Sequence, residues 1–210
     1  MFNFLKRDTG KYGESTILFG KDETSERRAW RNRMIDELIN DFKSTADNSL
    51  LELKIVVGEF NIGAQDTIKY ALDKEFKVME VIGGPKIWYD DNEDIYLLLS
   101  QTDDIKYYSR KKRPSIHFMI LGNKHLFLER HHRHDQSRET LGIENANEDY
   151  LKVYKEAFEL LKKESEFKKP EEVLKMGTYS DEYKCLLRHR TSGNKGKYEI
   201  YEDTEYAEIE

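Results

Sequence analysis

The feature that most constrains the fold is a strand–helix–strand pattern over residues 51–88, LELKIVVGEFNIGAQDTIKYALDKEFKVMEVIGGPKIW. Its first apolar run, IVV, ends at Gly58 and is typical of a strand buried on both faces. The run AQDTIKYALDK has apolar residues at helical spacing, and FKVMEVI predicts a second strand that ends at a Gly-Gly-Pro turn. Two strands joined through a helix lie parallel in one sheet, with a right-handed crossover.

The flanking segments extend this pattern. A short strand is expected at residues 15–19 and a helix at 24–43, where Trp30, Met34, Leu38 and Phe42 form one apolar stripe. We interpret the stripe as core packing or a dimer contact. Further along the chain, a helix is expected at 92–104, a short strand at 105–111, and the strongest helix at 144–167.

The stretch SIHFMILGNKHLFLERHHRHD, residues 115–135, contains five of the six histidines. Two apolar runs, at 113–121 and 124–131, are separated by Gly122-Asn123, and this dipeptide between apolar runs predicts a β-hairpin. We therefore expect a mixed α/β sheet with helices on both faces. It would comprise an N-terminal strand and helix extension at 1–49, an α/β domain at 50–168 and a C-terminal extension with an acidic tail at 169–210.

Composition narrows the class of protein. A single cysteine, Cys185, forms no internal disulfide, which favours a reducing, cytoplasmic compartment. The start of the sequence lacks the apolar region of a secretory signal, and no apolar run reaches the roughly 18 residues of a membrane span. Aromatic residues make up 12% of the chain, more than a disordered chain carries, so a folded domain is expected.

The charges are unevenly distributed. The net charge of −6 argues against a general nucleic-acid binder, but residues 105–134 hold eight Lys or Arg and one acid, Glu129. The last thirteen residues, YEIYEDTEYAEIE, hold six acids and no base. The basic segment predicts a ligand-binding surface for an anion. Its members are Arg110, Lys111, Lys112, Arg113, Lys124, Arg130 and Arg133.

The order of these elements resembles the phospholipase D-like family, over residues 50–165. LKIVVGEFNIGAQDTIKYALDKEFKVMEVIGGPKI looks like the family's opening unit, RPSIHFMILGNKHLFLE like its histidine-bearing hairpin, and EDYLKVYKEAFELLKK like its closing helix. The resemblance implies phosphodiester chemistry. In the family a histidine attacks phosphorus, a second histidine protonates the leaving oxygen, and lysines stabilise the phosphoryl charge. Members with one motif pair two chains, which implies a homodimer.

The catalytic motif of that family, His-x-Lys followed by an aspartate, is incomplete here. His117 occupies the histidine position, Met119 stands in place of the lysine, and Lys124 stands in place of the aspartate. Methionine carries no charge to neutralise a phosphoryl group, so the resemblance implies a degenerate active site. No Gly-Ser-x-Asn segment follows the hairpin.

Other residue groups have weaker functional interpretations. A metal site is one interpretation of His131, His132, His134 and Asp135. A zinc site usually needs a third ligand, and none is clear here, so we expect a solvated basic loop. Tyr107 and Tyr108 beside the run RKKR resemble a stacking platform for single strands. The GEFNIG and GGPK loops lack a phosphate-binding glycine pattern, so no nucleotide cofactor is expected. Cys185 with His189 has no orienting base nearby in the sequence.

Three functions follow from these observations. The first is a degenerate domain that binds a phosphate-bearing ligand, nucleic acid being the first expectation, without efficient hydrolysis. The second is a dimeric phosphodiesterase or nuclease that uses His117 of each chain, with Lys124 or an arginine replacing the missing lysine. The third is a protein-interaction module without a ligand. Within the first, the acidic tail at 198–210 either folds back on the basic segment or only solvates the chain.

Overall fold

A computed structural model gives the structure of the chain. It describes residues 11–58, 62–76, 78–85, 87–88, 104–129, 139–169, 172–173 and 177–178. Within these residues no helix is long and apolar enough to cross a membrane.

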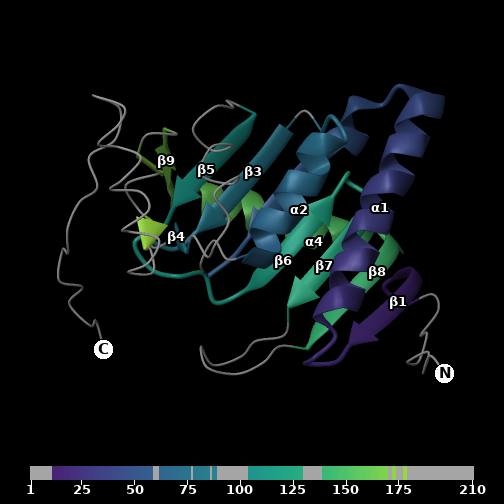
Figure 1. Cartoon of the computed structure of the whole chain (residues 1–210), viewed down its shortest axis with the longest axis horizontal. Helices are drawn as coiled ribbons and strands as arrows, with labels where there is room; N and C mark the ends of the chain where they lie inside the picture. Colours follow the sequence, from purple (N-terminus) through teal and green to yellow (C-terminus); the bar gives the residue numbers. More distant parts are fainter. Residues whose placement is uncertain are drawn as a thin grey trace, which may run out of the picture.

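The described residues form one eight-stranded mixed sheet in the order β1-β8-β7-β6-β2-β3-β5-β9, and a separate pair of short strands, β4 and β10 (Figure 1). The strands are β1 Gly13–Phe19, β2 Glu52–Val56, β3 Val78–Gly83, β4 Ile87–Trp88, β5 Ile105–Ser109, β6 His117–Leu121, β7 His125–Glu129, β8 Thr140–Ala146, β9 Glu166–Lys168 and β10 Gly177–Thr178. The helices are α1 Thr24–Thr45, the short 3-10 helix η1 Asn48–Leu51, α2 Ile62–Asp73 and α4 Glu148–Lys163.

The centre of the sheet is parallel and its flanks are antiparallel. β2 and β3 pair in parallel through the α2 crossover, and β5 continues the parallel order beside β3. β6 and β7 form the expected hairpin, whose turn residues Gly122 and Asn123 both have positive φ, 57° and 53°. Gly and Asn adopt this left-handed conformation more readily than other residues, so both suit the turn. The predicted α/β class is confirmed.

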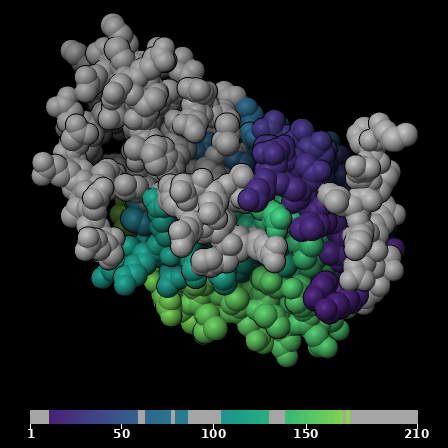
Figure 2. Space-filling model, turned by 90° about the horizontal axis from the view of Figure 1, so that it is seen from below, coloured from purple at the N-terminus to yellow at the C-terminus, as the bar shows by residue number. Residues whose placement is uncertain are grey.

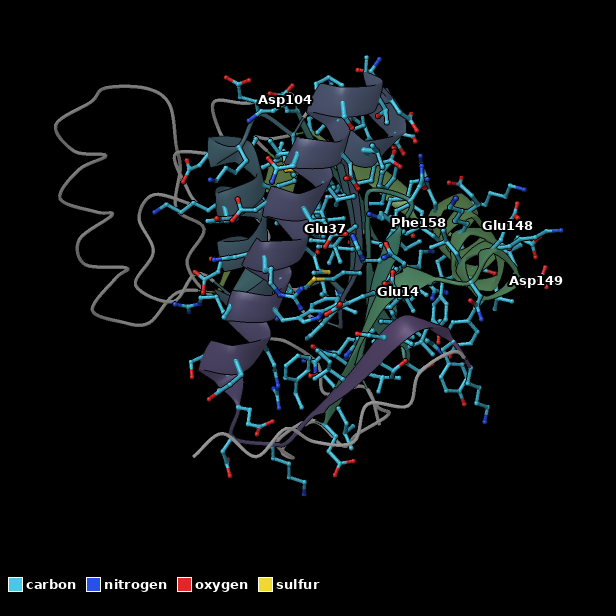
Figure 3. All side chains as sticks on the ribbon, turned by 90° about the vertical axis from the view of Figure 1, so that its right-hand side faces the viewer. Glu14, Glu37, Asp104, Glu148, Asp149 and Phe158 are labelled. Carbon is cyan, nitrogen blue, oxygen red and sulfur yellow. The ribbon has the colours of Figure 1, made fainter. Side chains whose placement is uncertain are left out.

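Helices cover both faces of the sheet. α1 and α2 lie on one face and α4 lies on the other, with Phe158 of α4 against the strands (Figure 3). The apolar stripe of α1 packs into the first core, where Trp30, Met34 and Leu38 are buried and Phe42 is partly buried. The central strands β2, β3, β6 and β7 contribute side chains to both cores, so the sheet separates two apolar layers.

Two parts of the fold differ from the expected organisation. Residues 13–45, expected as an extension, belong to the same sheet and core as the rest, because β1 pairs with β8 and α1 packs on the sheet. Residues 144–146, expected as the start of the long helix, form the end of strand β8, and the helix begins at Glu148. The expected helix at 92–104 lies almost wholly outside the described residues.

Candidate functional site

The sheet topology brings several loops to one end of the sheet. β2, β3 and β5 finish there, and β6, which runs antiparallel to β2, begins there with His117. β7 runs back along β6 and finishes at the same end with Glu129, which pairs in register with His117. We refer to this as the carboxyl end of the sheet. Ligands of open α/β sheets bind at the carboxyl ends of parallel strands, so this end is the candidate site.

Both ring nitrogens of His117 have partners within the protein. Nδ1 lies 3.0 Å from a carboxylate oxygen of Glu129, and Nε2 lies 3.1 Å from the backbone carbonyl oxygen of Pro114. Both partners are acceptors, so only the doubly protonated imidazolium donates to both of them. In that form neither nitrogen has a lone pair with which to attack phosphorus.

The imidazole of His117 also packs tightly against the end of β2. A methyl group added at Gly58 would lie 2.7 Å from Nε2, which is closer than a side-chain carbon ever approaches. The side chain of His117 is 13% exposed and that of Glu129 is 16% exposed. The absence of a side chain at position 58 therefore allows the ring to lie over the backbone, between Glu129 and Pro114.

A buried arginine lies behind Glu129. Arg31 of α1 is 6% exposed, donates from Nε to the hydroxyl of Thr67 at 2.8 Å, and places its guanidinium 4.9 Å from the ring centre of Phe127. Burial lowers the pKa of Arg31 to about 10, while the charges of Glu129 and Asp66 act in the opposite direction. The charge of Arg31 therefore compensates that of Glu129 from the core side.

Met119 has no access to this site. It is 5% exposed, lies in the core under α1 and α2, and pairs in register with Ile55 and Phe127. Alternation along β6 places it on the same face as His117, so a lysine here would have to bury its stem in the core. Its position supports the interpretation of a degenerate motif, since the apolar side chain contributes to packing.

The basic run, residues 110–113, leaves β5 at the carboxyl end of the sheet. Arg110 forms an ion pair with Glu164 at 2.6 Å, and its backbone N–H donates to the carbonyl of Gly83. The side chain of Arg113 packs over Gly84, where an added methyl group would lie 3.0 Å from its Cγ. Lys111 and Lys112 are exposed and have no acidic partner within the described part of the chain.

The structure does not bring Lys124 to the basic run. It lies in the β6–β7 turn, at the opposite end of the hairpin from His117. Its ammonium is 2.8 Å from Glu37 and 2.6 Å from Asp41 of α1. Burial opposes the charge of Lys124, but the two carboxylates outweigh it and raise its pKa. Lys124 therefore fastens the hairpin to α1.

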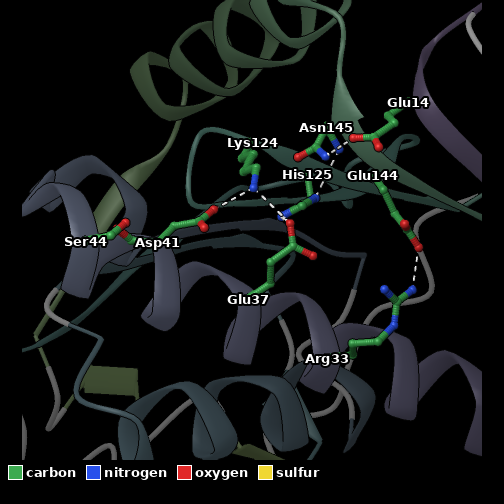
Figure 4. Close-up of polar contacts among 9 residues, drawn as sticks. All are labelled: Glu14, Arg33, Glu37, Asp41, Ser44, Lys124, His125, Glu144 and Asn145. Carbon is green, nitrogen blue, oxygen red and sulfur yellow. Dashed lines mark hydrogen bonds and ion pairs between the residues drawn. The ribbon is translucent and has the colours of Figure 1, made fainter.

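The next residue, His125, is fully buried in the same cluster. Burial lowers the pKa of His125 to about 4, so the ring is neutral at ordinary pH. Its Nδ1 accepts the backbone N–H of Asn145 at 3.2 Å, and its Nε2 lies 3.7 Å from Glu37 (Figure 4). This histidine is a structural residue of the hairpin.

The two tyrosines beside the basic run do not form a stacking platform. Tyr107 is 1% exposed and donates its hydroxyl to the carbonyl of Gly84 at 3.1 Å. Tyr108 faces α4 instead, half-buried, with its hydroxyl 3.3 Å from Glu80. Alternation along β5 separates the two rings onto opposite faces of the sheet, because residues adjacent in a strand point in opposite directions.

Several predicted residues lie outside the described part of the chain. They are Arg130, His131, His132, Arg133, His134, Asp135, Cys185 and His189. Within the described residues, no group of three or more His, Cys, Asp or Glu side chains is arranged to hold a metal ion.

Sequence reasoning missed four contributors to this end of the sheet. Glu129, the Pro114 carbonyl, Arg31 and Phe167 reach it only through the sheet pairing and the packing of α1. Glu129 carried a weak signal, because it lies as far after Asn123 as His117 lies before it. The other three carried no signal in the sequence.

Comparisons with known proteins show only a distant likeness to solved structures. No protein-family model matches the chain, and no curated protein matches it. Solved structures that resemble it include TrmBL2, described as an archaeal chromatin protein with a novel mode of DNA binding, at 12% identity and a TM-score of 0.46. Nuc from Salmonella typhimurium, described as a phospholipase D family member, has 11% identity and a TM-score of 0.48. NucT from Helicobacter pylori has 10% identity and a TM-score of 0.43.

The extent of these matches differs. They cover 73%, 74% and 71% of this chain, respectively. The chain spans about half of the TrmBL2 chain, 53%, and nearly all of the other two, 98% and 96%. All three matches have TM-scores below 0.5, so the likeness to the phospholipase D-like family remains the resemblance of sequence pattern and element order described above.

Proposed function

We propose that the chain binds a phosphate-bearing ligand, with nucleic acid as the first candidate, at the basic run and without efficient hydrolysis. The observation that carries the proposal is the state of Lys111 and Lys112. Both are exposed at the carboxyl end of the sheet and have no acidic partner among the described residues. Cations in this state attract phosphates because no internal carboxylate competes for them.

The fold adds further cations to this surface. The antiparallel pairing of β5 with β9 brings residues 162–169 beside residues 105–113. The teal surface of residues 104–129 adjoins the green surface of α4 in Figure 2. The two segments, which together we call the basic surface, carry nine lysines or arginines and two glutamates. A local balance of +7 on a chain of net charge −6 supports an anionic partner for this edge of the sheet.

The geometry around His117 favours binding over turnover. Its Nε2 is bonded to the Pro114 carbonyl, and Met119 leaves no ammonium beside it. Attack on phosphorus would require the contact between Nε2 and the Pro114 carbonyl to break, so that this nitrogen could face the phosphorus. Binding at Lys111 and Lys112 does not require that contact to break.

The test compares binding and turnover in the same samples. Fluorescence anisotropy with a labelled single-stranded oligonucleotide is measured for the native chain, for Lys111→Ala/Lys112→Ala and for His117→Ala. The proposal expects weaker binding in the lysine variant and no loss in His117→Ala. A matched control, Lys43→Ala/Lys152→Ala, removes the same charge from exposed positions on α1 and α4. Equal weakening by both double variants, or no binding by the native chain, would contradict the proposal.

A second candidate function is a dimeric phosphodiesterase that uses His117 of each chain. The 3.0 Å contact between Nδ1 and Glu129 favours it, because a carboxylate in that position fixes the orientation of an imidazole and supports its basicity. A generic phosphodiester incubated with native protein and with His117→Ala tests this candidate. Turnover that disappears in the variant, from a protein that sediments as a dimer, would favour the enzyme over the binding protein.

A further inference from the structure

We propose that Phe167 is a stacking subsite for an unpaired base of single-stranded nucleic acid. The subsite lies on the α4 face of the sheet, beside the basic surface. This inference rests on the proposed function and narrows its ligand from any phosphate-bearing molecule to one that also presents free aromatic rings.

Phe167 is held in an exposed position by its neighbours. It lies on β9, the last strand of the sheet, in register with Tyr108 of β5, and the two ring centres are 5.7 Å apart. Its side chain is 50% exposed, which is unusual for a phenylalanine. Glu166 and Lys168 pair with each other at 2.8 Å and, by strand alternation, point to the other face. The ring of Phe167 therefore leaves one side open to solvent.

The ring of Tyr108, which contacts Phe167, is held in place by Lys162 and Glu80. The ammonium of Lys162 lies 4.9 Å from the ring centre of Tyr108 and 2.6 Å from Glu80, which is 7% exposed. The Tyr108 hydroxyl lies 3.3 Å from the same glutamate. Burial and the Glu80 charge raise the pKa of Tyr108, so its hydroxyl keeps its proton. A fixed ring beneath Phe167 reduces the entropy that stacking would cost.

The basic run follows this aromatic pair directly along the chain of β5. Ser109 pairs with Glu166, so the basic run begins one residue beyond the register of Phe167 with Tyr108. Strands rise about 3.3 Å per residue, which places Arg110 about 7 Å along the sheet from Tyr108 and on the same face. Lys111, Lys112 and Lys163 are exposed and have no acidic partner among the described residues. Lys169 is also exposed, and its backbone N–H donates to the carboxylate of Glu172.

The kind of ligand follows from two features together: the exposed ring of Phe167 and the lysines that have no acidic partner among the described residues. An apolar patch for a protein partner would extend beyond one ring, but the other exposed large apolar side chains of the described residues belong to other elements than β9. They are Leu18 on β1, Ile116 before β6, and Val153 and Leu160 on α4. Double-stranded nucleic acid presents phosphates but keeps its bases stacked on each other. A single strand offers both a backbone for the lysines and a free base for Phe167.

The test separates stacking from charge. Three labelled probes of equal length are titrated by fluorescence anisotropy: oligothymidylate, an abasic strand with the same phosphates, and a duplex. The native chain is expected to bind oligothymidylate more tightly than the abasic strand. Phe167→Ala is expected to weaken oligothymidylate binding by roughly 5- to 100-fold and to leave the abasic strand unchanged. Phe167→Trp should keep the preference, and Leu160→Ala, which truncates another exposed apolar side chain, serves as the matched control.

The outcomes distinguish the two proposals. If the native chain binds oligothymidylate and the abasic strand equally well, the stacking subsite is overturned while the proposed function stands. If the native chain binds none of the probes, the proposed function itself fails. If Phe167→Ala weakens both single strands equally, the residue has a structural role and the inference is again overturned. Circular dichroism of each variant establishes that it is folded.

Discussion

The partners of its two ring nitrogens decide which reactions His117 can carry out at the carboxyl end of the sheet. A nucleophilic histidine needs a free lone pair on one nitrogen, while a carboxylate holds the other nitrogen in place. Glu129 provides the carboxylate, but the carbonyl of Pro114 accepts a hydrogen bond at the nitrogen that would attack. Gly58 allows this arrangement, since any side chain there would displace the ring.

Gly58→Ala is expected to destabilise the fold by about 1–3 kcal/mol, because the new methyl group would overlap the imidazole of His117. Chemical denaturation measures the free energy of unfolding. In a double-mutant cycle, Gly58→Ala should cost less when His117→Ala has already removed the ring. Strictly additive losses would show that the two residues do not interact in the way the structure places them.

His125 is expected to make the stability depend on pH. Its pKa is about 4 in the folded chain, below the ordinary value of 6.5, because burial outweighs the nearby charges of Glu37, Asp41 and Glu144. Below pH 6.5 the unfolded chain therefore binds a proton that the folded chain does not. The free energy of unfolding should fall as pH decreases from about 6.5 to about 4, by up to ~3 kcal/mol from this group.

Denaturation curves across that pH range for the native chain and His125→Gln measure this contribution. The glutamine does not titrate, so the variant should lose stability less steeply on acidification, whatever its stability at neutral pH. Parallel curves for the two proteins would show that the histidine is not held neutral in the fold.

Among the elements, the β6–β7 hairpin has a structural contact at its turn and the candidate site at its open end. Lys124 and His125 fasten its turn to α1, and His117 and Glu129 lie at its open end. The sequence places all four residues within one short stretch, so it suggested one basic patch. A hairpin reverses direction, and residues near its turn are separated from its open end by the length of the strands.

The sequence predicted the elements with strong local patterns. The βαβ unit, the α1 helix, the hairpin and the α4 helix all carry a clear apolar period. Strand β8 was missed because its signal is not local. Gly142 weakens the strand pattern, and its missing side chain makes room for Trp30, whose ring would otherwise lie 2.7 Å from an added methyl group. That contact joins residues more than a hundred positions apart, so no local pattern reports it.

The α4 helix is expected to depend on the ion pair between Lys162 and Glu80. Glu80 is 7% exposed in the sheet, and Lys162 is the group that compensates its charge from α4. Lys162→Met should lower the free energy of unfolding by about 2 kcal/mol, because it leaves a carboxylate buried without a cation. Adding Glu80→Gln should recover part of that loss. Thermal or chemical denaturation of the three proteins measures both effects, and a further loss in the double variant would contradict the pairing.

The whole molecule combines a net charge of −6 with a basic surface that the fold assembles from two distant segments. Sequence reasoning found the segment around the basic run. It could not find residues 162–169, because only the pairing of β9 with β5 brings them together. The site prediction named residues of one half of this surface, and it included Lys124, which forms ion pairs with α1 at the other end of the sheet.

The salt dependence of binding tests the central claim most directly. The observed binding constant for a single-stranded oligonucleotide is measured by anisotropy over a range of salt concentrations, for the native chain and for Lys111→Ala/Lys112→Ala. Each phosphate neutralised contributes a slope of about −0.7 in the logarithmic plot for a single strand. The account predicts a negative slope for the native chain that becomes shallower by about 1.4 in the variant. No binding at low salt, or the same slope in both proteins, would contradict it.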